Sequence, residues 1–465
     1  MKRYNPTPIS FYSFSFLALF LLLNPGCATH ERLLLIAPGV LPHTTRDMKT
    51  AGFWISRHPD PDMVILNREE IKELNARTFK RNGKGENDFD RSVSGNGQAL
   101  KKTLESAWED IKRRNLFAGN GRPAREEFFS SILTNMDLEA IPDKIDVRFG
   151  LVSQYANQRV LPTENGLNEI SGDIDFDELQ NSALDVGTPV RVLHQSRDGE
   201  WLYVQGQTSD GWVVKESIVI DFLENLETFL QPKDFVVVVS PKADIFQDER
   251  QTLYYYGYAQ MGTRFPLHRP RLTNINYDII EILLPIHGDG DAQWERGFVN
   301  REDVHLGYLP YTPKNILKQA FKLLNAPYGW GGMYGEQDCS RFLQEVFSTV
   351  GIILPRNSSE QAKVGLSLAG FSENSSDQDK LEILNTKAVG GITILPMKGH
   401  IMLYLGMVDG RPFAIHATWG YRENVRGEDV VRVLNRVVVS DLSLGEGSKK
   451  GSLLKRVSAV QLIAK

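Results

Sequence analysis

Apolar positions recur at helical spacing in the first third of the chain. The segment "NREEIKELNARTFK" places Ile71, Leu74 and Phe79 on one side of a helix, and "QALKKTLESAWEDIKRRN" repeats the pattern. The stretch "RNGKGENDFDRSVSGNG" between them is polar and rich in Gly and Asn, which is typical of a loop. Residues 30–145 are therefore predicted to form a helical N-terminal domain.

The pattern then changes to short runs with strand periodicity. In "TPVRVLHQSRDGEWLYVQGQTSDGWVVKESI" apolar and polar residues alternate, with turn signals at Asp198-Gly199 and Asp210-Gly211. We expect a small SH3-like β-barrel over 146–234. The segments "DGWVVKESI" and "RGFVNREDV" correspond to one another as an internal repeat, which predicts a second SH3-like barrel over 235–310.

A third pattern begins near residue 311. Thr312 is a predicted N-cap with Pro313 at the first helical position, and Asn325 ends the apolar face of this helix. A second helix starts in "CSRFLQEVFSTV", and the strands "GGITILPM", "HIMLYLGMV" and "RPFAIHATW" follow. Helices followed by an antiparallel sheet indicate an α+β domain of a catalytic type over 311–465. The predicted fold class is thus multidomain.

The N-terminus has the pattern of an export signal. Lys2 and Arg3 precede the apolar run "FYSFSFLALFLLL", so residues 1–29 are set apart from the fold. The following "LLLNPGC" resembles the end of a bacterial lipoprotein signal, in which Cys27 becomes lipid-modified; simple cleavage near Ala28 is the alternative. Either route predicts an exported protein of the cell envelope or periplasm, with membrane attachment only through a lipid.

Composition narrows the possible partners. The 465 residues carry a formal net charge of -5, so no basic excess is available to neutralise the phosphates of a nucleic acid. No later run approaches the ~18 apolar residues of a membrane span. We expect a monomer that binds neither nucleic acid nor a cofactor.

The placement of Cys339 predicts chemistry. The chain holds two cysteines, and if Cys27 is lipidated or removed, Cys339 has no disulfide partner. It occupies the first turn of a predicted helix, where unpaired N–H groups and the helix dipole favour an anion. The sequence therefore predicts a thiol pKa below its usual ~8.5 and a nucleophile that needs a base.

His400 and His416 are the candidate partners of this thiol. They stand on neighbouring predicted strands, 16 positions apart by their numbering. A hairpin centred near Val408 places both on one face, whereas a tight turn at Asp409-Gly410 places them on opposite faces. The catalytic interpretation thus depends on a wider loop. A zinc site is disfavoured, because one Cys and two His do not make a closed tetrahedral set.

The motifs of this region resemble those of a known family. "PYGWGGMYGEQDCSRFLQEVF", "GHIMLYLG" and "FAIHAT" are similar to the catalytic blocks of the NlpC/p60 cell-wall cysteine peptidases, which have a papain-like fold. Arg341 departs from the pattern, because a Gly is commonest at that position. The matching residues are Tyr328, Trp330, Gly331, Gly332, Asp338, Cys339, Ser340, Gly399, His400 and His416.

This resemblance implies a reaction. Two bacterial SH3-like barrels ahead of the peptidase resemble the subgroup that hydrolyses the amide between γ-D-Glu and a diamino acid in peptidoglycan peptides. Cys339 would attack, His400 would carry the proton and His416 would orient His400. The backbone N–H of Cys339 and the Tyr328 hydroxyl would stabilise the oxyanion.

The subgroup also implies a substrate pocket for peptides with a free N-terminal L-Ala. Asp338 would bind the ammonium with Ser340 as partner, and Arg356 would bind the α-carboxylate of D-Glu. An aromatic residue of the first barrel would close the pocket, with Trp212 as the candidate and Tyr203 behind it. Such closure predicts a preference for short released peptides over intact wall.

Three other functions remain open from the sequence. The same Cys and His pair fits an N-acetylmuramoyl-L-alanine amidase or an acyltransferase. A non-catalytic peptidoglycan-binding lipoprotein is the alternative outside the enzymes, although the intact Cys339, His400 and His416 speak against it. The choice between diaminopimelate and Lys as third substrate residue also stays open.

Overall fold

The computed structural model describes residues 34–81, 89–268, 278–288, 292–372 and 374–465. Cys27 and the predicted export signal lie outside the described residues. Within the described ranges, no helix is long and apolar enough to cross a membrane.

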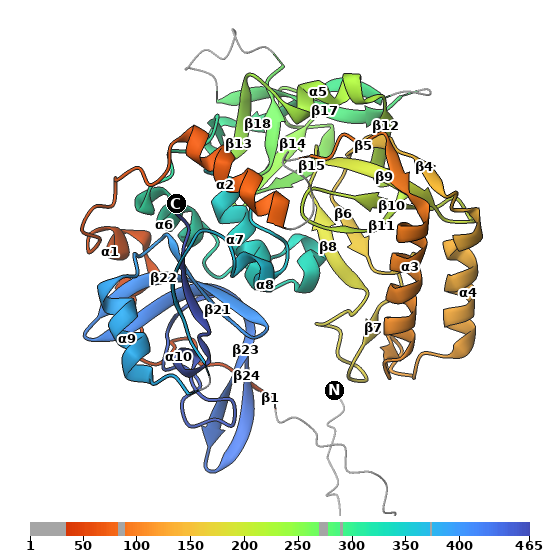
Figure 1. The fold of residues 1–465 in the computed structure, drawn as a ribbon. Helices are drawn as coiled ribbons and strands as arrows, with labels where there is room; N and C mark the ends of the chain where they lie inside the picture. The colour runs from red at the N-terminus through yellow and green to blue at the C-terminus, as the bar shows by residue number, and fades with distance from the viewer. Residues whose placement is uncertain (1–33, 82–88, 269–277, 289–291, 373) are drawn as a thin grey trace, which may run out of the picture. The chain divides into compact units, whose positions relative to one another are not determined.

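The C-terminal domain is built on a seven-stranded sheet with the order β1-β24-β23-β22-β21-β25-β20 (Figure 1). The strands are β1 (Leu34–Ile36), β20 (Leu366–Gly370), β21 (Thr393–Met397), β22 (His400–Val408), β23 (Arg411–Val425), β24 (Glu428–Asp441) and β25 (Ala459–Leu462). One face packs on α6 (Pro313–Lys322) and α7 (Cys339–Ser348); the other packs on α9 (Asp377–Thr386) and α10 (Leu453–Arg456). The sheet is therefore covered on both faces.

Helix α6 forms as its sequence predicts. The Thr312 side chain accepts a hydrogen bond from the Asn315 N–H at 3.2 Å, and Pro313 occupies the first turn. Its apolar stripe is buried against the sheet and α7. The helix thus delivers the chain to the loop that precedes Cys339.

Seven strands form the sheet of the first barrel, in the order β12-β5-β9-β10-β11-β6-β8. They are β5 (Arg148–Val152), β6 (Ala156–Arg159), β8 (Gln180–Leu184), β9 (Pro189–Gln195), β10 (Trp201–Gln205), β11 (Asp210–Val214) and β12 (Ile218–Asp221). Helix α5 (Leu223–Leu230) follows.

The next unit has its own apolar core and two sheets, β16-β13-β19 and β15-β14-β18-β17. These strands are β13 (Phe235–Val238), β14 (Lys242–Phe246), β15 (Tyr255–Gln260), β16 (Arg264–Pro266), β17 (Ile279–His287), β18 (Ala292–Asn300) and β19 (Val304–Leu306). Both repeat segments run from a strand through one 3-10 turn, Lys215–Ser217 or Arg301–Asp303, into a further strand. The repeat noted in the sequence therefore corresponds to one local structure used twice.

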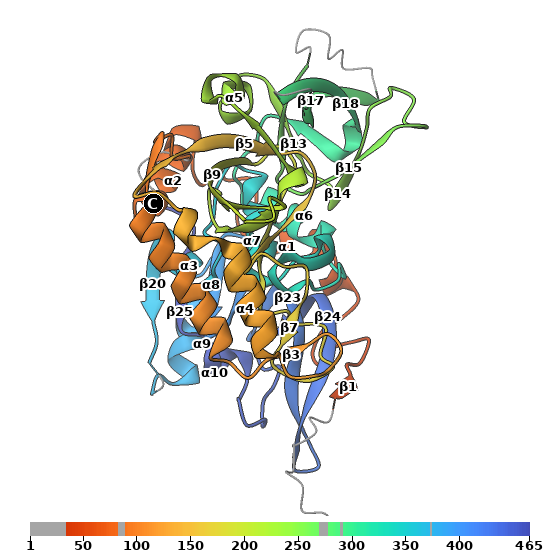
Figure 2. The same cartoon turned by 90° about the vertical axis from the view of Figure 1, so that its right-hand side faces the viewer.

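The prediction of a single helical domain over 30–145 is wrong. Strand β1 pairs in parallel with β24, and α1 (Ala51–Ile55) and α2 (Arg68–Arg81) bury Trp54, Ile71 and Leu74 in the core of the C-terminal domain. In contrast, α3 (Gly97–Lys112) and α4 (Glu126–Met136) lie side by side and pack on the first barrel (Figure 2). Helical periodicity identified the apolar faces but carries no information about which partner covers each face.

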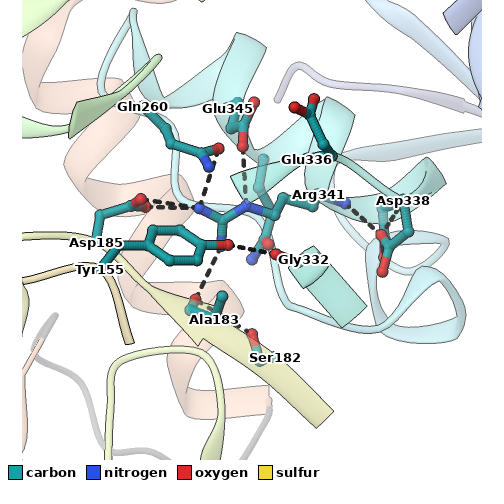
Figure 3. A network of polar contacts seen from close by, with 12 residues as sticks. Tyr155, Ser182, Ala183, Asp185, Gln260, Gly332, Glu336, Asp338, Arg341 and Glu345 are labelled. Carbon is teal, nitrogen blue, oxygen red and sulfur yellow. Dashed lines mark hydrogen bonds and ion pairs between the residues drawn. The ribbon is translucent and has the colours of Figure 1, made fainter. Parts of the chain in front are cut away.

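Arg341 joins three parts of the chain (Figure 3). Its guanidinium binds both carboxylate oxygens of Asp185, at 2.8 and 3.0 Å, and the carboxylate of Glu345 at 2.9 Å. It also donates to the Ala183 carbonyl at 2.8 Å, and Gln260 of the second barrel lies at 3.4 Å. Arg341, which stands where the family pattern has a Gly, therefore holds both barrels against helix α7.

We expect Arg341→Met to destabilise the fold by about 3–5 kcal/mol, because it leaves the buried Glu345 and the partly buried Asp185 carboxylates without their cation. Burial already raises the pKa of Glu345 to about 8 despite the Arg341 charge. The midpoint of urea unfolding followed by circular dichroism measures the change. Adding Asp185→Asn and Glu345→Leu should recover part of the loss.

The matched control is Arg113→Met, since Arg113 is 73% exposed and pairs with Asp110 within one helix. This change should stay within about 0.5 kcal/mol. Equal effects of the two substitutions would show that the buried network adds no stability.

Candidate active site

Asp338 organises the start of the helix that carries Cys339. Its carboxylate caps α7 by accepting hydrogen bonds from the N–H groups of Ser340 at 3.1 Å and Arg341 at 2.9 Å. It also accepts a hydrogen bond from the Gly331 N–H at 3.2 Å, which ties the glycine-rich loop to the helix. Gly331 has φ 62° and Gly332 has φ 85°, so this loop needs residues without a Cβ.

Arg356 completes a buried cluster with Asp338 and Ser340. One Nη2 N–H donates to Asp338 at 2.5 Å, Nη1 donates to the Ser340 hydroxyl at 2.8 Å, and Nε donates to the Ser182 hydroxyl at 3.0 Å. The structure thus brings together the three residues expected to bind substrate. They also bind one another and strand β8 of the first barrel.

The hairpin between β22 and β23 has a tight turn, so the expected wide loop is wrong. Asp409 and Gly410, with φ 48° and 74°, form a two-residue connection with Val408 opposite Arg411. Continued without interruption, that register would place the two histidines on opposite faces.

A β-bulge restores the arrangement. The register shifts between Tyr404 and Gly406, and from there Leu403 pairs with Ile415. His416 then falls opposite Met402, two residues from His400 on the same face. The catalytic interpretation survives because of one extra residue in the strand rather than a longer loop.

The two imidazoles form a hydrogen-bonded chain that ends on Ser440. His400 Nε2 lies 2.7 Å from His416 Nδ1, and His416 Nε2 lies 2.9 Å from the Ser440 hydroxyl on β24. If His400 donates from Nε2, His416 accepts at Nδ1 and donates to Ser440, and His400 Nδ1 keeps its lone pair. This tautomer is the one that can accept a proton from a thiol.

Cys339 packs in the same buried cluster as Ile401, the residue that follows His400. The pairing of β22 with β23 stops at Leu403, and the Ile401 N–H acts on the thiol by lowering its pKa. Cys339 and His400 each keep 9% exposure, whereas His416 keeps 1%. Cys339 and His400 are therefore more exposed than His416, although all three are buried.

The expected low pKa of the Cys339 thiol is contradicted. Burial in the apolar core, together with the negative charge of Asp338, raises the pKa to about 12, although the Ile401 amide and Arg356 act in the opposite direction. Burial lowers the pKa of His400 to about 3, and that of His416 well below its usual value. At neutral pH the resting site holds a neutral thiol beside neutral imidazoles.

Trp212 and Tyr203 do not close the pocket, which corrects a further prediction. Trp212 is fully buried, and Tyr203 packs against it with ring centroids 5.5 Å apart in the core between the first barrel and helices α3 and α4. Strand alternation places both side chains on the inward face of the barrel, where helices α3 and α4 cover them. The described residues leave no space for a substrate beside these rings.

Phe176 is an aromatic residue of the first barrel that packs against the glycine-rich loop before Cys339. Its ring lies 5.3 Å from Trp330, 5.2 Å from Trp419 and 6.4 Å from Tyr328, measured between centroids. Trp330 and Trp419 also donate hydrogen bonds to the Asp177 carbonyl and the Asp175 carboxylate. Tyr328 in turn lies within electrostatic reach of Cys339 and Asp338.

Sequence reasoning missed Phe176, Ser440 and the role of Arg341. Phe176 stands in the acidic loop "GDIDFDELQ", where a single aromatic residue has no core to enter, and that was the available signal. Ser440 carries no motif of its own. Its contact depends on the register His416↔Val438 between β23 and β24, which only the structure fixes.

Comparisons with known proteins agree with this geometry. Residues 325–431 match the model of the NlpC/P60 family, and residues 168–214 match the SH3 domain of SH3b1 type. An NlpC/P60 endopeptidase from Photobacterium damselae subsp. piscicida has the same fold, with a TM-score of 0.74 and 24% identity over 92% of this chain and 98% of that one. No curated protein matches the chain.

A second solved structure, of an NlpC/P60 family protein from Bacillus cereus, gives a TM-score of 0.44 and 17% identity over 62% of this chain and 83% of that one. The two model matches identify an NlpC/P60-type domain over residues 325–431 and an SH3 domain over residues 168–214. The NlpC/P60 family is a family of cysteine peptidases, and Cys339 and His400 both fall inside the matched domain.

The buried histidines predict a pH dependence of stability. Their folded pKa values lie below the unfolded value of about 6.5, so the unfolded chain binds more protons between these values. The contribution of these histidines to the free energy of unfolding is therefore fully present above pH 6.5 and is lost as the pH falls. We expect His416→Gln to reduce this slope by about 1.4 kcal/mol per pH unit near pH 5.

Urea unfolding midpoints between pH 4.5 and 7.5 test this expectation. His43→Gln is the control, because His43 is exposed to water in the folded protein. An identical slope in wild type and His416→Gln would exclude a buried neutral His416.

Proposed function

We propose that this protein is an exported cysteine endopeptidase that hydrolyses the amide between γ-D-Glu and a diamino acid in peptidoglycan peptides. The observation that carries the proposal is the hydrogen-bonded chain from His400 through His416 to Ser440, with Cys339 packed in the same buried cluster as Ile401, the residue after His400. These groups fit nucleophilic catalysis by a thiol and its base.

In the proposed reaction, Cys339 loses its proton to His400 Nδ1 as the sulfur attacks the amide carbonyl carbon. A neutral resting thiol, with its pKa raised by burial, requires this transfer to accompany the attack. The tetrahedral intermediate collapses as His400 returns the proton to the leaving amine, and the C–N bond breaks. Water then attacks the thioester, with His400 as base, and releases the acid and the thiol.

His416 and Ser440 act on His400 rather than on substrate. Imidazolium formed at His400 donates from Nε2 to His416, which is itself fixed by Ser440. The Cys339 N–H and the Tyr328 hydroxyl are the proposed donors to the oxyanion. Burial raises the pKa of Tyr328 well above its usual range, so its hydroxyl keeps the proton it would donate.

The proposed substrate is a short peptide with a free N-terminal L-Ala. Asp338, Ser340 and Arg356 lie together at the start of α7 and would contact the L-Ala-D-Glu portion. The aromatic contacts of Phe176 with Trp330 and Trp419 place the first barrel against the catalytic loop. A barrel in this position would block one end of the substrate groove, which favours short released peptides over the cross-linked polymer.

The setting of the reaction is proposed from the N-terminal residues. The apolar run after Lys2 and Arg3 supports export, and "LLLNPGC" supports a lipid at Cys27. Peptidoglycan peptides occur in that compartment, where a peptidase of this type would meet them.

Mass spectrometry of products tests the reaction. Wild type and Cys339→Ala would be incubated with L-Ala-γ-D-Glu-meso-diaminopimelate and with its N-acetylated form. We expect release of L-Ala-D-Glu by wild type only, and only from the free-amine peptide. Release of an intact peptide from muropeptides, with L-Ala still attached, would identify an amidase instead. Clearing of whole sacculi without tripeptide turnover would contradict the preference for short peptides.

Ser440 offers a test of the histidine chain. We expect Ser440→Ala to lower kcat about tenfold, which corresponds to about 1.4 kcal/mol, with little change in KM, because the lost hydrogen bond orients the base and does not touch substrate. Ser440→Thr keeps the hydroxyl and should restore most of kcat. If kcat and its pH profile stayed at the wild-type values in Ser440→Ala, Ser440 would have no role in orienting the histidines.

A further inference from the structure

Arg456 differs from four arginines that bind carboxylates away from water. Arg159, Arg341, Arg356 and Arg422 each bind a carboxylate within 2.5 to 2.8 Å. Arg456 is half-buried, yet among the described residues its guanidinium has no hydrogen bond or ion pair, and desolvation alone acts on its pKa, lowering it. A partly desolvated cation without a counter-charge is unfavourable unless a ligand supplies that charge.

The position of Arg456 is next to the candidate base. It ends α10, and the following residue, Val457, bridges to Met397. Met397 pairs with His400 across the turn between β21 and β22. The Arg456 charge also acts on the His400 imidazole by lowering its pKa.

Two guanidinium groups thus flank the Cys339–His400 pair from different sides. Arg356 acts on the Cys339 thiol and belongs to the cluster that contacts the first barrel. Arg456 acts on His400 and comes from α10, on the opposite face of the sheet from α7. Unlike that of Arg356, its guanidinium has no hydrogen-bond or ion-pair partner among the described residues.

We propose that Arg456 binds a carboxylate of the diamino acid on the leaving side of the scissile amide. This inference rests on the proposed function and adds a specificity residue to it. The leaving amine must receive its proton from His400, so the residue that carries this amine lies at the His400 side of the site. A guanidinium there matches a carboxylate by charge and by its paired N–H donors.

The leaving residue offers two carboxylates of the same chemistry. Every C-terminal diamino acid has an α-carboxylate beside the amine that is released, and diaminopimelate has a second one at the far end of its side chain. Binding to the first selects peptides that end at the diamino acid. Binding to the second selects diaminopimelate over Lys.

Steady-state kinetics of the full chain distinguish these sources. The substrates are L-Ala-γ-D-Glu-L-Lys, its C-terminal carboxamide, and the two mono-amides of the meso-diaminopimelate peptide. We expect Arg456→Gln to lower kcat/KM at least tenfold, mainly through KM, for peptides that keep the contacted carboxylate, and less than twofold for those in which it is amidated. Arg456→Lys should keep part of the preference.

The four peptides also separate a direct contact of Arg456 with substrate from an indirect effect on His400. All four react at the same imidazole, so an indirect effect of Arg456→Gln would lower their kcat/KM values equally. Lys455→Gln is the matched control, since Lys455 is an exposed cation on the same helix turn. It should change no ratio between substrates.

The outcomes separate the two proposals. If wild type cleaves the peptides and Arg456→Gln has no effect, or lowers all four equally, Arg456 binds no substrate carboxylate and the proposed function stands. If wild type cleaves none of the peptides, the proposed function fails and this inference fails with it.

Discussion

The carboxylate of Asp338 is the contact on which the site depends. It caps α7, holds the glycine-rich loop through Gly331 and binds Arg356. Arg356 passes the connection to Ser182 on β8. One buried anion therefore sets the position of the nucleophile and links the catalytic helix to the first barrel. Breaking a buried charge pair of this kind costs several kcal/mol, so these parts hold their places together.

The sheet adds a second constraint, because the histidines share a face only after the bulge near Gly406. From the sequence, the even separation of His400 and His416 was visible, and so was the Asp409-Gly410 turn that conflicted with it. A bulge has no reliable signature in a single sequence, since it inserts a residue without changing the alternation on either side. The sequence thus predicted that the two histidines must share a face, but it did not predict the bulge that places them there.

Much of the candidate site could be read from local pattern. The capped helix after Thr312, the Asp338-Cys339 helix start and the two histidines all follow from short-range rules. Errors arose where long-range packing decides the outcome. Helix α2 packs on the C-terminal domain, Trp212 is covered by the N-terminal helices, and burial outweighs the helix start in setting the pKa of the thiol. Each of these three features depends on which elements pack against one another in the folded chain. The spacing of residues along the sequence does not determine that packing.

Burial of Cys339 also bears on how its sulfur survives. It is the free cysteine of the described residues, and oxidants and disulfides react with a thiolate far faster than with a thiol. Because burial raises the pKa of this thiol, the sulfur is mainly protonated at neutral pH. The same desolvation that raises the pKa of the thiol therefore makes the Cys339 sulfur less reactive toward oxidants in the folded protein.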